Sequence, residues 1–291
     1  NAYVADVTPP DGRAKAFGWM GSAFSFGFLI GPALGGALGD IDLRLPFYVA
    51  AGLALVNGLY GLFVLPESLP LERRTARFEI AKANPLGSLK LLRSQQDLMG
   101  LATIGLLFQL AHTVLPSIFV LYTGYRYGWS PSVMGLAMMA SGVAGVLLQG
   151  FLVGPVVARI GERGALLLGA AGGALGFAWY GYAPTGVHYL MGIPIFALIG
   201  FLMPGLQGLM TRRVPPHQQG QLQGVNQSLQ GIASMLGPAL FGLTFAWSIR
   251  HEATLQAPGL AIYLASALLF AALVLGSRVA RASEPAGAAP A

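Results

Sequence analysis

The sequence predicts an all-α protein that crosses a membrane several times, and three observations lead to this prediction. Hydrophobic residues make up 55% of the chain and charged residues only 10%, whereas soluble domains carry about 25% charged residues. Eight apolar runs are each long enough to cross the hydrocarbon, which takes roughly 20 helical residues. Every Asp, Glu, Lys and Arg lies outside these runs, as expected where charged side chains are costly to bury in lipid.

The runs are separated by short polar turns, except for one long interruption after the second run. They cover residues 16–38, 45–65, 98–122, 133–157, 165–183, 189–211, 222–248 and 259–277. The interruption, residues 66–97, is polar, and we expect it to be a linker. Residues 278–291 are expected to form a disordered tail. The chain begins with Asn, and residues 1–6 look like the end of a further helix, so we expect an N-terminally truncated protein.

The distribution of Lys and Arg among the turns predicts the orientation. Of the 17 Lys and Arg residues, only Arg44, Arg126 and Arg250 fall on one side of the predicted spans, and the other 14 fall on the opposite side. Cytoplasmic loops carry the excess of Lys and Arg. The linker and the C-terminus are therefore predicted to be cytoplasmic, in a multi-pass protein of the cell inner membrane.

An internal repeat supports a two-bundle organisation. At an offset of 206 residues, Gly31-Pro32-Ala33-Leu34 matches Gly237-Pro238-Ala239-Leu240, and Gly36 matches Gly242. Repeats in transporters mark pseudo-symmetric bundles with the substrate path between them. The offset fits six spans per repeat, so the second bundle is complete in residues 98–277 and the first is incomplete.

The first complete span carries a small residue at every fourth position: Ala23, Gly27, Gly31, Gly35 and Gly39. Positions four apart share one face of a helix. A glycine face lets a second helix approach to backbone contact in lipid, and Pro32 should bend the helix. A generic packing helix is the alternative interpretation of this stripe.

The longer pattern Gly27-x-x-x-Gly31-Pro32-x-x-Gly35-Gly36 resembles the fifth-helix antiporter motif of the major facilitator superfamily, in its 12-span drug:proton antiporter branch. Further stretches look like the tetracycline-resistance-type (TCR/Tet) efflux proteins. They are Ala2–Asp6, Arg13–Gly18, Pro66–Ser68, Asn84–Leu86, Gly154–Arg163 and Gln219–Gly224. The resemblance implies proton-driven export of small amphipathic compounds, including antibiotics.

The resemblance also assigns the parts of the chain. It implies a partial N-terminal bundle in residues 1–65, holding the end of span 4 and spans 5 and 6. Residues 66–97 are then the cytoplasmic central linker, 98–277 the C-terminal six-helix bundle with spans 7 to 12, and 278–291 the cytoplasmic tail. In tetracycline pumps a histidine of the eighth span and an aspartate of the ninth contribute to transport. The corresponding positions here are Gly145 and the vicinity of Gly173, which weakens a tetracycline assignment.

The family's charged loop implies a cytoplasmic latch, in which charges at helix ends pair in one conformation and separate in the other. The copy in the second bundle keeps Gly154, Arg159, Gly161 and Arg163, but Ala158 replaces its acid. The resemblance assigns Asp6 and Arg13 to the latch of the first bundle. The alternative for Asp6 is a helix-end charge without a partner.

Few polar side chains within the spans could contact a substrate. His112 is the only member of the Asp, Glu, Lys, Arg and His set in the eight runs, and Gln109 lies three residues away on the same helix face. The other candidates are Gln149, Gln207, Asn226 and Gln230. A histidine can carry a proton, although a neutral histidine bonded to a neighbouring helix is the commoner case. Tyr122, Tyr125, Tyr127 and Trp129 are expected to form an interfacial belt.

Other functional classes lack support in the sequence. There is no cysteine, no phosphate-cradling GxxxxGK[ST] motif, no pair of intramembrane carboxylates and no metal-spaced histidine set. We therefore expect no cofactor, no metal, no enzyme activity and no nucleic-acid partner. The expected partners are a small-molecule substrate, protons and the lipid bilayer, with a monomeric protein. The alternatives are an importer of a small metabolite on the same fold, or a non-transporting integral-membrane protein.

Overall fold

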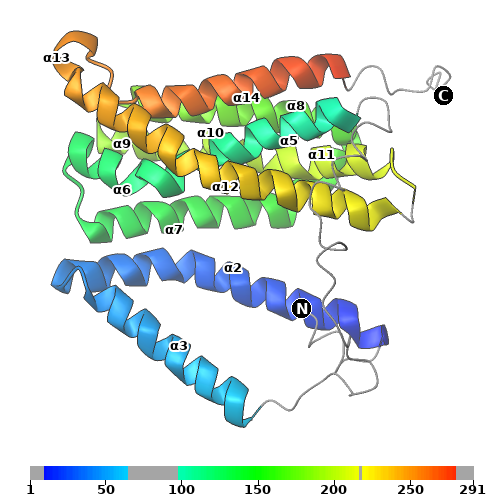
Figure 1. Cartoon of the computed structure of the whole chain (residues 1–291), viewed down its shortest axis with the longest axis horizontal. Helices are drawn as coiled ribbons and strands as arrows, with labels where there is room; N and C mark the ends of the chain where they lie inside the picture. The colour runs from blue at the N-terminus through cyan, green and yellow to red at the C-terminus, as the bar shows by residue number, and fades with distance from the viewer. Residues whose placement is uncertain (1–9, 65–97, 216–217, 280–291) are drawn as a thin grey trace. The chain divides into compact units, whose positions relative to one another are not determined.

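The computed structural model describes residues 10–64, 98–215 and 218–279, and it describes few side chains before Leu29. Helices account for almost all of this part of the chain, and it contains no strand (Figure 1). The predicted linker lies outside the described residues, as does the predicted tail from residue 280 on, whereas residues 278 and 279 still belong to the last helix. The chain divides into two compact units: residues 1–83 with 129–143, and residues 84–128 with 144–291.

The first unit contains α2 (Pro10–Ile41), α3 (Leu45–Phe63) and the beginning of α7 (Pro131–Leu147). The turn between α2 and α3 is closed by Asp42, whose Oδ1 accepts a hydrogen bond from the Arg44 backbone N–H at 2.7 Å. Pro46 lies in the first turn of α3, where a missing N–H costs nothing because the first turn has no intrahelical acceptor for it. None of the α3 residues is buried, so this helix presents apolar side chains on all sides within the described chain.

The second unit holds the remaining helices. In chain order they are α5 (Leu98–His112), α6 (Val114–Tyr127), the end of α7, the π-helix η3 (Leu148–Leu152), α8 (Val153–Tyr182), α9 (Gly186–Met191), α10 (Ile193–Ala197), the 3-10 helix η4 (Leu198–Phe201), α11 (Leu202–Thr211), α12 (Gln219–Arg250), α13 (Glu252–Leu255) and α14 (Leu260–Val279).

The core of the second unit is built around α8, which packs against α14, α11 and η4. Glycines on α8 make this close packing possible. An ideal Cβ on Gly169 would collide with the backbone of Leu202, and one on Gly176 would lie 2.6 Å from the Cα of Phe196. Small residues bring helices together in this way where lipid supplies no hydrophobic driving force. α8 therefore needs glycine at the positions where α11 and α10 pack against it.

The described residues of the eight predicted spans are almost all helical, which confirms the predicted all-α membrane fold. Six helical stretches of the described chain are long and apolar enough to cross a membrane, and one of them runs through residues 131–182. In that stretch the backbone leaves helical geometry at Gly161, with φ 72° and ψ 171°. A positive φ suits glycine because it has no Cβ. Gly161 thus separates the predicted spans 133–157 and 165–183.

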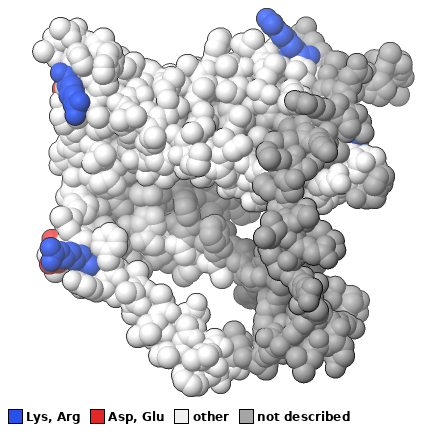
Figure 2. All heavy atoms as spheres, viewed as in Figure 1, with Lys and Arg blue, Asp and Glu red and all other residues white. Residues whose placement is uncertain are grey.

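Charged side chains lie toward the ends of the helices. On the face shown in Figure 2, the coloured Lys, Arg, Asp and Glu atoms gather near the ends, and the described surface between them is uncharged. This distribution agrees with the charge pattern of the sequence and leaves the long helices apolar along their length.

Candidate functional site

The structure brings together two of the predicted amide side chains. Gln207 of α11 accepts a hydrogen bond through its Oε1 from the Nδ2 of Asn226 on α12, at 3.3 Å. Both residues are half-buried. A polar pair shared by two apolar helices satisfies part of its own hydrogen-bonding capacity and keeps the rest available. The pair is therefore a fixed polar point on an otherwise apolar surface.

The amides of α12 extend away from this pair along one side of the helix. Gln223, Asn226, Gln227 and Gln230 follow a spacing of three, four and seven residues, which places them on one face. Gln223, Gln227 and Gln230 are exposed in the described chain. We call these four residues the amide stripe. Its side chains are uncharged at every physiological pH, so they can orient a ligand without taking up protons.

Gln109 and His112 lie at the end of α5, where the helix is interrupted before α6 begins. The Thr113 N–H is shared between the carbonyls of Gln109 at 3.3 Å and Leu110 at 3.1 Å. The His112 ring packs at 5.6 Å from the ring of Phe108 and its side chain is exposed. The structure thus places both residues at an interruption in a spanning helix, but no described hydrogen bond joins them to Gln207 or Asn226.

Gln149 lies in the π-helix η3 and is exposed. Its neighbour Leu148 is buried against Ala165 and Phe201. π-Helical turns are rare in proteins, and those that occur often lie at functional sites. The sequence offered no signal for this distortion, because residues 148–152 have the same apolar character as the helix on either side.

A second cluster lies around Gly161, in the turn that was predicted to be a latch. Glu162 pairs with Arg212, with 2.8 Å between Oε1 and Nη2. The Glu162 side chain is 19% exposed and that of Arg212 is 76% exposed. Gly208 leaves room for this carboxylate, since an ideal Cβ there would lie 2.5 Å from the Glu162 Cδ. The bridge joins α8, at the residue after Gly161, to Arg212, which directly follows α11.

The other latch candidates have different surroundings. Arg159 is exposed and Arg163 is half-buried on α8. A Cβ on Gly154 would meet nothing within 4 Å. Asp6 lies outside the described residues, as does the side chain of Arg13. Their roles in the latch therefore stay predictions.

Sequence reasoning missed Glu162. The family spacing puts the acid at position 158, where this chain has Ala158. The signal was nevertheless present, because Glu162 directly follows Gly161 and is flanked by Arg159 and Arg163. An acid in a basic turn is a candidate for an ion pair even when its spacing differs from the motif.

The glycine motif of α2 contacts α7 within the first unit. An ideal Cβ on Gly36 would collide with the Pro131 carbonyl, and one on Gly135 would collide with the carbonyl of Pro32. A Cβ on Gly39 would touch the Pro131 side chain at 3.3 Å. Among the described residues, a Cβ on Gly27, Gly31 or Gly35 would meet nothing within 4 Å. The observed contact therefore uses the side of α2 that carries Pro32 and Gly36, and a packing role for the Gly27–Gly35 face stays a prediction.

The expected aromatic belt needs a correction at Tyr122. Only 1% of this residue is exposed, and its hydroxyl donates to the carbonyl of Tyr180 at 2.9 Å. Tyr122 also makes an edge contact with the ring of Phe245. A tyrosine can enter a core once its O–H finds an acceptor. Tyr125, which is 51% exposed, keeps the surface position expected of a belt residue.

Comparison with known proteins places this arrangement in a family. The family model described as Major Facilitator Superfamily matches residues 1–238. The chain belongs to the Major Facilitator Superfamily. It is 36% identical over 250 residues to the class C tetracycline resistance protein of Escherichia coli, covering 85% of this chain and 62% of that protein. It is also 30% identical over 255 residues to multidrug resistance protein 2 of Bacillus subtilis (strain 168), covering 86% and 62%.

A solved structure agrees on the fold. The human organic anion transporter MFSD10 (TETRAN) superposes with a TM-score of 0.59 at 24% identity, over 94% of this chain and 66% of that chain. The resemblance to tetracycline-resistance-type proteins, drawn from the motifs, is thus confirmed by relatives of that type. The chain spans about 62% of the length of the class C protein and 63% of the class G protein of Vibrio anguillarum.

Proposed function

We propose that the protein is a secondary active transporter of the cytoplasmic membrane that exports small amphipathic compounds by proton antiport. The observation that carries this proposal is the Gln207–Asn226 bond between α11 and α12. It holds neutral hydrogen-bonding groups on helices whose other faces are apolar. Ligand sites of this kind combine an apolar wall with a few placed polar groups, and they suit a lipophilic compound with scattered donors and acceptors.

The direction of transport is supported by the relatives. Proteins named for tetracycline resistance and multidrug resistance match this chain over most of its length. A membrane transporter confers resistance by moving a compound out of the cytoplasm, so export fits these relatives better than uptake. The glycine-proline motif of α2 adds support, because it resembles the antiporter motif.

The proton carrier is a separate part of the proposal. Within the eight predicted spans His112 is the only side chain of the acidic, basic and histidine set, and an ionisable group in a span is a functional candidate by default. We propose that Gln109 and His112 contribute to substrate contact and that His112 adds a pH response. Replacing His112 with Gln should retain compound binding and flatten any pH dependence of transport over the range in which histidines titrate.

Transport is tested in inside-out membrane vesicles with a fluorescent lipophilic compound added to the outside medium, or loaded inside to follow movement in the opposite direction. Because the chain spans 62% of the class C protein, it is assayed alone and in a chimaera in which that protein supplies the remaining spans. Compound uptake driven by an inside-acid pH gradient, abolished by a protonophore, is the expected result for the chimaera. Gradient-independent accumulation would contradict antiport, and movement only in the opposite direction would favour the importer alternative.

A further inference from the structure

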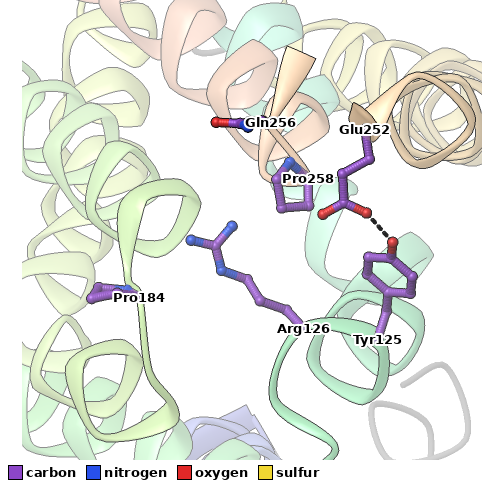
Figure 3. A pocket seen from close by; sticks show the side chains of 6 residues that line it. All are labelled: Tyr125, Arg126, Pro184, Glu252, Gln256 and Pro258. Carbon is purple, nitrogen blue, oxygen red and sulfur yellow. Dashed lines mark hydrogen bonds between the residues drawn. The ribbon is translucent and has the colours of Figure 1, made fainter. Parts of the chain in front are cut away.

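A pocket opens at the ends of the helices opposite the Glu162–Arg212 bridge, within the second unit. It encloses about 620 Å³ and is lined by Tyr125, Arg126, Pro184, Glu252, Gln256 and Pro258 (Figure 3). These residues come from the end of α6, from the turn after α8, from the start of α13 and from the turn between α13 and α14. Arg126 belongs to the side of the protein with few basic residues, which the charge pattern predicts to be extracytoplasmic.

Each charged group of the pocket is held by its own partners. The Arg126 guanidinium donates from Nε to the Ala183 carbonyl and from Nη2 to the Tyr182 carbonyl, both at 3.0 Å. The Glu252 carboxylate accepts a hydrogen bond from the Tyr125 hydroxyl. Arg126 and Glu252 are not paired with each other, although Figure 3 shows both side chains reaching into the same space. The pocket therefore presents a positive and a negative group at separate fixed positions.

This separation selects a particular ligand chemistry. The remaining N–H groups of Arg126 favour an anionic oxygen such as that of a phosphate. Glu252, an acceptor when ionised, favours an ammonium group that can donate hydrogen bonds. Gln256 and Pro258 line the turn above α14, with Gln256 held at a positive φ of 45°. A molecule that carries both a phosphate and a primary ammonium offers one group to each of these two side chains.

The surroundings of the pocket favour a lipid as the source of this group. Exposed apolar side chains lie close to the lining residues in the chain: Leu121 one turn before Tyr125, Trp247 five residues before Glu252 and Leu255 next to Gln256. Trp and Tyr at the ends of spans mark the headgroup level of a bilayer. On α12 the exposed apolar residues continue from Trp247 to Leu243, which gives an acyl chain a surface along the helix.

We propose that this pocket binds the zwitterionic headgroup of an aminophospholipid in the extracytoplasmic leaflet, with the phosphate on Arg126 and the ammonium on Glu252. The inference is independent of the transported compound and of its direction. It requires only that the second unit is embedded in a membrane in the orientation given by the charge pattern.

The test compares two lipids that share phosphate and acyl chains. The purified chain is mixed with micelles containing equal amounts of phosphatidylethanolamine and phosphatidylcholine, and native mass spectrometry counts the lipid retained. The choline headgroup has no N–H to donate, so we expect phosphatidylethanolamine to be retained about two- to fivefold more, as for a partly exposed ion pair. Glu252→Gln keeps the shape and the hydrogen bond to Tyr125 and should remove this preference.

The matched control is Arg250→Gln, which removes an exposed charge on the same end of α12 outside the pocket lining. It should keep the preference. Equal retention of the two lipids by the unaltered chain would overturn the proposal, as would an undiminished preference in Glu252→Gln. Soluble phosphoethanolamine is the third arm. If it displaces the lipid at equal concentration, the pocket takes a free zwitterion rather than a membrane lipid, and the proposal is overturned in its choice of source.

Discussion

The tetrapeptide Gly-Pro-Ala-Leu occurs once in α2 and once in α12, and the two copies make contact through different glycines. In α2, Gly36 is buried against Pro131, while Gly31 is exposed in the described chain. In α12, Gly237, the counterpart of Gly31, is buried against Thr113, while a Cβ on Gly242 would meet nothing within 4 Å. Five residues turn a helix by about 140°, so the two glycines serve different faces.

This difference shows that the motif permits close approach on two faces of the helix. Which face is used depends on the segment that packs against it. In the first unit the partner of α2 is the first turn of α7, whose Pro131 carbonyl lies over Gly36. In the second unit the partner of α12 is the interruption between α5 and α6, where Thr113 fills the space left by Gly237. The sequence repeat therefore predicts that both glycines of each copy permit a close helix contact, and the structure shows which of the two makes it.

The largest effect is expected for Gly237→Leu. The position is buried, and even a Cβ would lie 2.7 Å from the Thr113 Cβ, which cannot rotate away. Overpacking of this kind costs about 1–3 kcal/mol or more, so membrane abundance and thermal stability should fall. Gly242→Leu is the matched control and should leave both unchanged. If the contact with Thr113 causes the loss, the stability lost in Gly237→Ala should be partly recovered when Thr113→Gly is added. Equal stability of Gly237→Leu and Gly242→Leu would refute this explanation.

Gly36→Leu should have the next largest effect. Its Cβ would collide with the Pro131 carbonyl, a backbone atom, so α2 and α7 must separate at a cost of about 1–3 kcal/mol. Circular dichroism melting of the purified protein measures the loss. Gly52→Leu on α3, where a Cβ meets nothing within 4 Å, is the control. A melting temperature of Gly36→Leu equal to that of the control would show that α2 does not pack on α7.

Gly31→Leu sharpens the comparison because stability and transport should respond differently. A Cβ on Gly31 meets nothing within 4 Å among the described residues, so we expect membrane abundance to be kept. The glycine stripe predicts that transport in the chimaera is nevertheless lost, since a branched side chain would block a close helix approach on that face. Transport near the unaltered level at equal abundance would show that the Gly27–Gly35 face is a lipid-facing surface.

Sequence alone predicted most of the fold and part of the site. The eight spans and the turn near Gly161 followed from hydropathy and loop charge, because the bilayer restricts both strongly. The pairing of Gln207 with Asn226 did not follow, since both were only members of a list of amides. The interruption at Thr113 and the π-helix at Gln149 were also missed. These features depend on which helix crosses which, and local composition does not encode the crossing.

The smallest effect is expected for the Glu162–Arg212 bridge. Arg212 is 76% exposed, and an exposed ion pair is worth about 0.2–1 kcal/mol. Glu162→Gln should therefore lower stability by less than about 1 kcal/mol, which chemical denaturation in mixed micelles can measure. The exchanged pair Glu162→Arg with Arg212→Glu should restore the stability lost in Glu162→Arg alone. A loss in the exchanged pair equal to the sum of the two single losses would show that the bridge contributes nothing.

We infer that substrate contacts the amide stripe, which continues from the Gln207–Asn226 pair along α12, and cysteine protection tests this contact most directly. The chain has no native cysteine, so once any cysteines in the supplied spans of the chimaera are replaced, a single cysteine at Gln230 reports on that position alone. In the chimaera, the compound with the fastest vesicle transport should slow maleimide labelling at Gln230→Cys. The same compound should leave labelling of Met235→Cys, at an exposed position outside the stripe on the same helix, unchanged. Labelling of Gln230→Cys at the same rate with and without saturating compound would contradict the account.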